Sequence, residues 1–399
     1  MAKEKISVDA SDVGSRLFHL DSIRGVAALL VLIAHFVMVP SITVAEPSFA
    51  SLVQHIDFAR IGVVLFFLVS GFVIPYSLKR GHTIWAFGIK RVFRLYPAYW
   101  VSLISAILMG IFFTNQNYPL QQIIANTTML QNFLHSQNIL GVYWTLKLEL
   151  GFYILAALIF CIDHLDNTKF IAFLSALLFV VFIVYLDYWT GFSHFGERIF
   201  SELHLLKDNA SGGAGNAANH PIPGLLNMNW GNFCGYFSAM FLGTALRLLA
   251  EGRANRFDRA IIIGIGFLWA GLLSIIGLVA YSRTHDLGLF SMCGSWVVSL
   301  LLFIILTFYI KLKMRAFVWL GVVSYSVYLF HPLVIDGMFA TQFISKLLLH
   351  SPIFGLLICI GITAVAAQIS FSLIEQPVIA LGHSIARKAG RNGFKISGA

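Results

Sequence analysis

Charged side chains are scarce in this sequence of 399 residues. Asp, Glu, Lys and Arg together make up 11% of the chain, whereas hydrophobic residues make up 58%. The mean hydropathy is +0.82. A chain so poor in charge and so rich in apolar residues lies outside the range of ordinary soluble domains. The composition therefore excludes a soluble globular protein and predicts a protein that spans a membrane.

Cysteine and long polar segments are also rare. The four cysteines are Cys161, Cys234, Cys293 and Cys359. They are far apart and lie in or beside apolar runs, which is typical of small buried side chains rather than of disulfides or metal ligands. The pattern offers no zinc-type ligand cluster, so we expect no metal site. No internal repeat is visible, and we expect one membrane domain over 20–380, between an amino-terminal segment 1–19 and a basic tail 381–399.

Long apolar runs are the dominant feature of the chain. Ten runs have about the 18 to 25 residues that cross a bilayer, and they lie at about 20–39, 57–77, 92–113, 142–162, 170–188, 230–250, 260–281, 287–310, 316–338 and 352–379. The first run follows a long polar lead and has no small-residue cleavage site, so it predicts a retained helix rather than a signal peptide. We therefore expect an all-α fold: a polytopic membrane helical bundle of about ten transmembrane helices.

The positive charges are concentrated on one side of these predicted spans. With the amino terminus in the cytoplasm, most of the 27 Lys and Arg residues fall on the inner side, and the exceptions are Arg60, Lys147, Arg198, Lys207, Arg283 and Lys346. Such asymmetry predicts that both termini are cytoplasmic. The net charge of +9 then reports topology and an inner face that suits phosphates, and we expect no nucleic-acid partner.

The stretch "LDSIRGVAALLVLIAHFVMV", the first span, carries Arg24 near its start and His35 near its far end. Each such residue costs about 2.5 to 3.5 kcal/mol on insertion scales, which makes it a functional candidate. Eleven positions at 100° per residue bring the two onto one face of a helix, about 16 Å apart along its axis. We expect Arg24 near the inner membrane surface and His35 in the outer half of the membrane.

Glu149, in "GVYWTLKLELGFY", is the second intramembrane candidate. Its predicted depth in the fourth span is similar to that of His35, so a carboxylate–imidazole pair is allowed, in which the carboxylate orients a general base. Two alternatives stay open: a neutral His35 that hydrogen-bonds between helices, and an ion pair of Glu149 with Lys147. The ion pair is disfavoured because residues two apart point to different sides of a helix.

Further polar or small residues mark the inner end of the bundle. In "KRVFRLYP", Arg91 and Arg94 would form neighbouring forks beside Lys90, suited to a phosphate or pyrophosphate, although binding of lipid headgroups explains them as well. In "FFLVSGFVIPY", Ser70 and Gly71 allow close approach of a ligand or simply of another helix.

Two outer connections differ from each other in character. The connection at about 114–141 has no Asp, Glu, Lys or Arg but many amides, which suit a hydroxyl-rich ligand. The connection at about 189–229 contains "ASGGAGNAANHPIPG", a composition that predicts a mobile loop.

Six stretches of the sequence, taken in order, resemble acyltransferase family 3 of integral membrane enzymes. They are "LDSIRGVAALLVLIAHF", "FFLVSGFVI", "IKRVFRLYPAYW", "YWTLKLELGFY", "SYSVYLFHPL" and "FSLIEQPVIALG". The resemblance implies transfer of an acyl group, commonly acetyl from cytoplasmic acetyl-CoA, to sugars of cell-surface or secreted polysaccharides or to other exported molecules. Thr145 stands where serine is common in the family. The esterase-like domain that some members carry is not expected after the last span.

The resemblance also implies roles for individual residues and a location in the bacterial cytoplasmic (inner) membrane. We expect His35 and Glu149 to be catalytic, and acyl-CoA to be a co-substrate, with no permanently bound cofactor. The expected donor-binding residues are Arg24, Lys90, Arg91, Arg94, Ser70 and Gly71. The expected acceptor-binding residues are Trp144, Tyr153 and His331. The partners are then acyl-CoA, a glycan or other hydroxyl-bearing acceptor and membrane lipid, and a homo-oligomer is compatible with the sequence.

In the predicted mechanism, the first helix acts as a ruler. The phosphates of acyl-CoA bind at its inner end, the pantetheine arm spans the 16 Å estimated above from helix rise, and His35 activates the acceptor hydroxyl. A covalent acyl-histidine relay stays open. The alternative function is a transporter or flippase of a lipid-linked glycan or exported metabolite. Such proteins often show paired repeats and interrupted helices, and the sequence displays neither.

Overall fold

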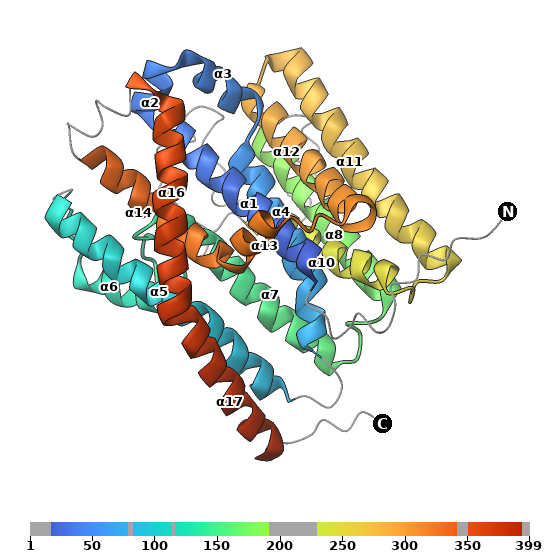
Figure 1. The fold of residues 1–399 in the computed structure, drawn as a ribbon. Coiled ribbons are helices and arrows are strands. Elements are labelled where there is room, and N and C mark those ends of the chain that lie inside the picture. The colour runs from blue at the N-terminus through green and yellow to red at the C-terminus, as the bar shows by residue number, and fades with distance from the viewer. Residues whose placement is uncertain (1–16, 79–82, 114–115, 191–229, 341–349, 393–399) are drawn as a thin grey trace.

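A computed structural model describes residues 17–78, 83–113, 116–190, 230–340 and 350–392. Within these ranges, every regular element is helical (Figure 1). Nine helices there are long and apolar enough to cross a membrane, and a bent pair gives a tenth candidate. The predicted all-α membrane bundle is therefore confirmed. The predicted mobile connection falls almost entirely in 191–229, outside the described residues, as do 1–16 and 393–399.

The long helices follow one another along the whole chain. They are α1 (Phe18–Val37), α4 (Phe58–Val73), α5 (Ile84–Phe113), α7 (Trp144–Cys161), α8 (Thr168–Thr190), α10 (Trp230–Ala250), α11 (Arg256–Thr284), α12 (Leu287–Ile304) and α16 (Pro352–Ser370). The last of these continues through a π-helical turn, Phe371–Glu375, into α17 (Gln376–Asn392). Part of the predicted basic tail is thus helical. The short helices α2 (Pro40–Ala45) and α3 (Pro47–His55) lie at the end of the bundle opposite to α17 (Figure 1).

Helix α4 lies at the centre of the bundle and packs against α1, α10 and α12. Small residues permit this packing, because a Cβ atom on Gly71 would lie only 1.7 Å from the carbonyl oxygen of Met240 in α10. Hydroxyl groups join the same helices: Thr244 donates to the Gly71 carbonyl at 2.8 Å, and Ser299 donates to the Ile61 carbonyl at 3.1 Å. The core is therefore held by close backbone contacts and by hydroxyl–carbonyl bonds between helices.

The ninth predicted span is interrupted, although its sequence predicted one continuous helix. Its two parts, α13 (Arg315–Val322) and α14 (Ser324–Ala340), meet at an angle of 77°. Helix α13 lies against the start of α1, where a Cβ atom on Gly321 would lie 1.8 Å from the Asp21 carbonyl oxygen. The glycine thus lets α13 fold back against α1. As a result, α14 begins inside the bundle, with its first turn close to α1 and α5.

The connection between α5 and α7 runs back along α5 towards the middle of the bundle instead of staying at the outer end of α5. It contains α6 (Leu120–Thr127) and ends in a short 3-10 turn, Gly141–Tyr143. The Tyr99 hydroxyl donates to the Asn126 carbonyl oxygen at 2.5 Å, and Tyr99 lies about 21 Å by helix rise from the outer end of α5. Helix α7 therefore starts well inside the bundle.

Several amides of this connection hold its own backbone. The Asn126 side chain is fully buried, donates to the Gln137 carbonyl at 2.9 Å and accepts from the Ile139 amide at 3.1 Å. Gln131 is also fully buried and donates to the Asn138 side chain at 2.5 Å. These two amides therefore stabilise the connection itself.

Candidate active site

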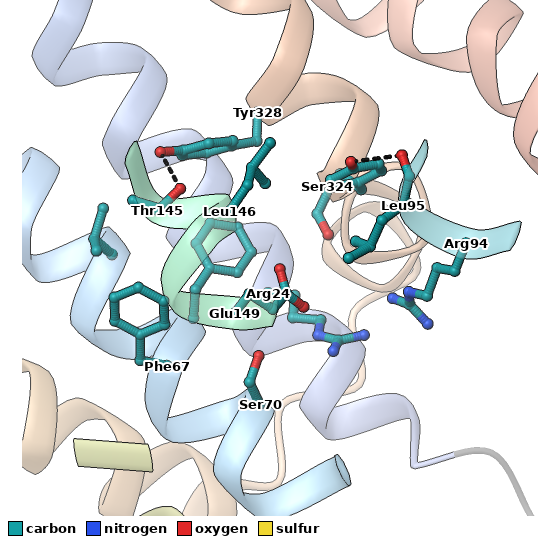
Figure 2. A pocket seen from close by; sticks show the side chains of 13 residues that line it. Arg24, Phe67, Ser70, Arg94, Leu95, Thr145, Leu146, Glu149, Ser324 and Tyr328 are labelled. Carbon is teal, nitrogen blue, oxygen red and sulfur yellow. Dashed lines mark hydrogen bonds between the residues drawn. The ribbon is translucent and has the colours of Figure 1, made fainter. Parts of the chain in front are cut away.

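An inner pocket is enclosed by α1, α4, α5, α7 and α14 (Figure 2). Its cavity volume is about 60 Å³, whereas a single water needs about 10 to 15 Å³ on this measure. It therefore admits a narrow chain more readily than a sugar ring. The polar or charged residues of its lining are Arg24, Ser70, Arg94, Thr145, Glu149, Ser324, Tyr325 and Tyr328.

The inner pocket carries more positive than negative charge. Arg24 of α1 and Arg94 of α5 both line it, against the single carboxylate of Glu149 (Figure 2). Glu149 accepts a hydrogen bond from the Tyr153 hydroxyl and interacts electrostatically with Arg24. Among the described lining residues, two guanidinium groups face one carboxylate, which favours an anionic ligand, while Glu375 interacts electrostatically with Arg94 from outside the lining.

The break in the ninth span adds to the positive potential of the inner pocket. The first residues of α14, Ser324 and Tyr325, line the pocket, so the N-terminal end of a 17-residue helix faces it. Helix N-termini carry unpaired backbone N–H groups and a partial positive charge. The Tyr325 hydroxyl donates to the Leu95 carbonyl oxygen at 2.8 Å and fixes this end of α14 against α5.

The two arginines of the Arg-x-x-Arg pair have different surroundings. Arg94 lines the inner pocket, but Arg91 turns to its wall. The Arg91 guanidinium lies 5.2 Å from the ring centres of both Phe87 and Tyr153 and donates to the Ser77 hydroxyl. Arg91 thus stabilises the wall of the pocket through cation–π contacts with two rings and does not face the cavity.

Of three other predicted donor-binding residues, one lines the inner pocket and two do not. Ser70 lines the inner pocket, whereas Gly71 packs against Met240, so helix packing accounts for this glycine. Lys90 is absent from the lining and interacts electrostatically with His383 of α17.

His35 and Glu149 are not partners in this structure. Both are described residues, and no hydrogen bond or ion pair joins them there. The expected depth of Glu149 was wrong because the preceding connection packs inward. The Tyr143 hydroxyl, one residue before α7, hydrogen-bonds Ser102 in the middle of α5 at 2.9 Å. Glu149 lies a further turn and a half inward and so reaches the level of Arg24.

His35 is instead paired with His331 of α14. The two ring centres are 4.9 Å apart in an edge-to-face arrangement. Nδ1 of His35 lies 2.8 Å from the Val31 carbonyl oxygen, and Nδ1 of His331 lies 3.1 Å from that of Val327. Each Nδ1–H therefore donates to its own helix, which leaves Nε2 as the basic nitrogen. Nε2 of the fully buried His331 has no hydrogen-bond partner in the described part of the chain.

Tyr328 separates the inner pocket from the histidine pair. Its ring lines the inner pocket and lies with its centre 5.8 Å from that of His331. The hydroxyl accepts from Thr145 at 2.8 Å and donates to the Val142 carbonyl oxygen at 2.9 Å (Figure 2). Thr145, the residue that departs from the family pattern, thus keeps the hydrogen-bonding role that a serine would have.

Of the expected acceptor-binding residues, only His331 lies beside His35. Tyr153 contacts Glu149 and Arg91, which places it behind the inner pocket. Trp144 packs against Tyr236 with ring centres 5.3 Å apart. The Lys147 ammonium donates to the Asn132 side chain at 2.8 Å rather than to Glu149, in agreement with the helical spacing.

Two acids within the predicted spans were missed from the sequence, buried Glu375 and exposed Asp336. Glu375 is 4% exposed, accepts from the Ser326 hydroxyl and interacts electrostatically with Arg94. Asp336 interacts electrostatically with His35. Both fall within predicted spans, so the rule that selected Glu149 as an intramembrane acid would have selected them too.

A bundle of this kind, with a cationic pocket at one end of a helix and a histidine pair towards the other, defines a polytopic membrane protein with polar side chains inside its helical core. A family model described as an acyltransferase domain matches residues 18–371, nearly the whole chain. The chain therefore belongs to acyltransferase family 3. It is a membrane O-acyltransferase that uses an acyl donor and a hydroxyl acceptor. The comparisons with curated proteins and with solved structures gave no match.

Proposed function

We propose that this enzyme transfers an acyl group, acetyl by family default, from cytoplasmic acyl-CoA to a hydroxyl of a cell-envelope or secreted polysaccharide. The transfer takes place on the outer side of the bacterial cytoplasmic membrane. The observation that carries this proposal is the course of α1, which has Arg24 in the cationic inner pocket and His35 against His331. These positions are about 16 Å apart by helix rise, a distance that an extended pantetheine arm can span.

The donor enters from the cytoplasmic end. Arg24 and Arg94 bind its phosphates, with Lys90 nearby at the inner end of α5 and Arg91 supporting the wall. The small volume of the inner pocket suits the thin pantetheine chain. The ring of Tyr328 stands between this pocket and His331, so we expect the thioester to reach His35 only when this side chain moves.

The chemical step then takes place at His35. Nε2 accepts the proton of the acceptor hydroxyl, and the oxygen attacks the thioester carbonyl carbon. The carbon–sulfur bond breaks as the ester forms, and the imidazolium returns the proton to the CoA thiolate. In the alternative that stays open, His35 is itself acylated first and passes the group to the hydroxyl. The Nε2 atom of His331, which has no hydrogen-bond partner among the described residues, would accept a hydrogen bond from the hydroxyl or the imidazolium.

The runner-up function is transport or flipping of a lipid-linked glycan. The interrupted ninth span is the observation in its favour, because transporters often bind their substrates at broken helices. The two functions are separated by incubating purified protein with acetyl-CoA and an envelope glycan extract and measuring free CoA. An acyltransferase releases CoA and labels the glycan, whereas a transporter leaves acetyl-CoA intact.

A cellular experiment tests the proposal as a whole. Mass analysis of surface glycans from a deletion strain, compared with its parent, should show the loss of one acyl mass per modified unit. Wild-type protein should restore this mass, and an equally abundant His35→Ala variant should not. Identical glycans in deletion strain and parent would contradict a role in glycan acylation.

A further inference from the structure

A second pocket lies beside the part of α14 that directly follows His331. We call it the outer pocket. It lies between α5, the α5–α7 connection and α14, and its cavity volume is about 460 Å³. Small-ligand pockets typically hold about 300 to 1,000 Å³. Pro332 and Leu333, which directly follow His331, form part of its wall, and Asp336 in the same wall interacts electrostatically with His35. A ligand in the outer pocket would therefore lie close to the proposed base.

The polar groups of the outer pocket suit hydroxyls. Asp336, Gln116 and Tyr118 all line it. The Tyr118 hydroxyl donates to the Gln116 side-chain oxygen at 2.8 Å, which leaves the Gln116 NH₂ group free to donate to a ligand. The carboxylate of Asp336 is an acceptor for hydroxyl or ammonium groups.

The charge of the outer pocket is of one sign. Asp336 is the only Asp, Glu, Lys or Arg among its described lining residues. The neighbouring connection, 116–141, contributes no Asp, Glu, Lys or Arg at all. Lys147, six residues after this connection, is directed to Asn132 and is not among the described lining residues. No described residue of the lining carries a positive charge that would compensate a negative charge on a ligand.

We propose that the outer pocket binds the sugar unit that carries the acceptor hydroxyl, and that Asp336 restricts this unit to neutral or amine-bearing sugars by repelling acidic ones. The proposal rests on the proposed function, since it assigns the acceptor class of the same transfer. It makes Asp336 a specificity-determining residue that acts on charge. The two claims, the negative potential and the sugar preference, are tested separately.

The first arm measures the potential without any enzymatic activity. Ala340 lines the outer pocket one helical turn from Asp336. In a full-length Cys161→Ser protein, Ala340→Cys is modified with cationic trimethylammonium-ethyl and anionic sulfonatoethyl methanethiosulfonate, with the labelling of the parent protein subtracted. Asp336→Asn should lower the cation-to-anion rate ratio up to about tenfold in low salt and severalfold at physiological salt. Val44→Cys on α2, where the native side chain is 82% exposed, is the matched control, whose ratio should not respond. An unchanged ratio at position 340 would overturn the role of Asp336.

The second arm measures acceptor choice. Purified protein is given radiolabelled acetyl-CoA with methyl β-glucoside, methyl β-glucosaminide or methyl β-glucuronide, and sugar ester and free CoA are measured. We expect the glucuronide to react more slowly than the glucoside, and Asp336→Asn to raise the glucuronide-to-glucoside ratio severalfold. An equal ratio in both proteins, or release of CoA with no sugar ester, overturns the assignment of the outer pocket. Absence of CoA release overturns the proposed function instead, while the potential measured in the first arm is unaffected.

Discussion

Replacement of Arg94 by alanine is the sharpest test of the donor site, because its neighbour Arg91 provides a matched control from the same helix. Arg94 lines the inner pocket, whereas Arg91 contacts Phe87, Tyr153 and Ser77 in the wall. A charge-assisted hydrogen bond to a phosphate contributes about 1.5 to 3 kcal/mol. Arg94→Ala should therefore weaken donor binding about ten- to hundredfold. Lysine at this position should recover only part of the loss, because it keeps the charge but not the planar fork.

The matched Arg91→Ala variant should behave differently. It loses two cation–π contacts and a hydrogen bond inside the protein, so we expect a lower melting temperature and a smaller loss of donor affinity. The assay is calorimetric binding of a non-hydrolysable acetyl-CoA analogue to purified protein, with thermal unfolding measured in parallel. Unchanged affinity in Arg94→Ala, or a larger loss in Arg91→Ala than in Arg94→Ala, would refute the division of roles described here. The cationic cluster would then serve lipid headgroups.

Three further predictions concern other parts of the molecule. His35→Ala should remain inactive at any donor concentration in a steady-state assay and should keep its donor affinity, and a rate that recovers at high acyl-CoA would argue against a base at this position. Glu149→Gln should lower the melting temperature, because Arg24 loses its buried counter-charge, yet it should leave the pH dependence of kcat unchanged; a moved pH optimum would instead favour coupling to His35. Asp166 lies outside the membrane spans. Burial raises the pKa of its carboxyl, but hydrogen bonds from Arg247 and Arg253 lower this pKa by a larger amount, so the net value is below the ordinary 3.8. Stability from Asp166 is then complete above pH 3.8 and lost as the pH falls through the lower folded value. Since this side chain is 59% exposed, Asp166→Asn should cost less than about 1 kcal/mol at pH 7 in denaturant unfolding, and an equal cost at pH 2 would contradict the ion pairing.

The sequence predicted those features that depend on spacing within one helix. The ten apolar runs correspond to the spans, and Arg24 and His35 lie on α1 with the separation that helical rise requires. Lys147 and Glu149, two residues apart, indeed have different partners. These predictions hold because helix geometry converts residue number directly into direction and distance.

Features that depend on contacts between distant segments could not be predicted in this way. Glu149 was assigned the depth of His35 on the assumption that α7 begins at the membrane surface. The bond between Tyr99 and Asn126 shows that the preceding connection packs inward, which moves the whole helix start. The bend before Ser324 likewise depends on how Gly321 packs against α1. Asp336, by contrast, was accessible to sequence reasoning and was overlooked.

The most direct test of transfer along α1 uses membranes in which the two substrates lie on opposite sides. Inverted membrane vesicles from the deletion strain, carrying either wild-type protein or His35→Ala, are supplied with radiolabelled acetyl-CoA outside, at the cytoplasmic face, while envelope glycan is enclosed in the lumen. The account predicts that the enclosed glycan becomes labelled with the wild-type protein and stays unlabelled with His35→Ala. Labelling of the glycan at the wild-type rate in His35→Ala vesicles, or labelling only when donor and glycan share one side of the membrane, would contradict it.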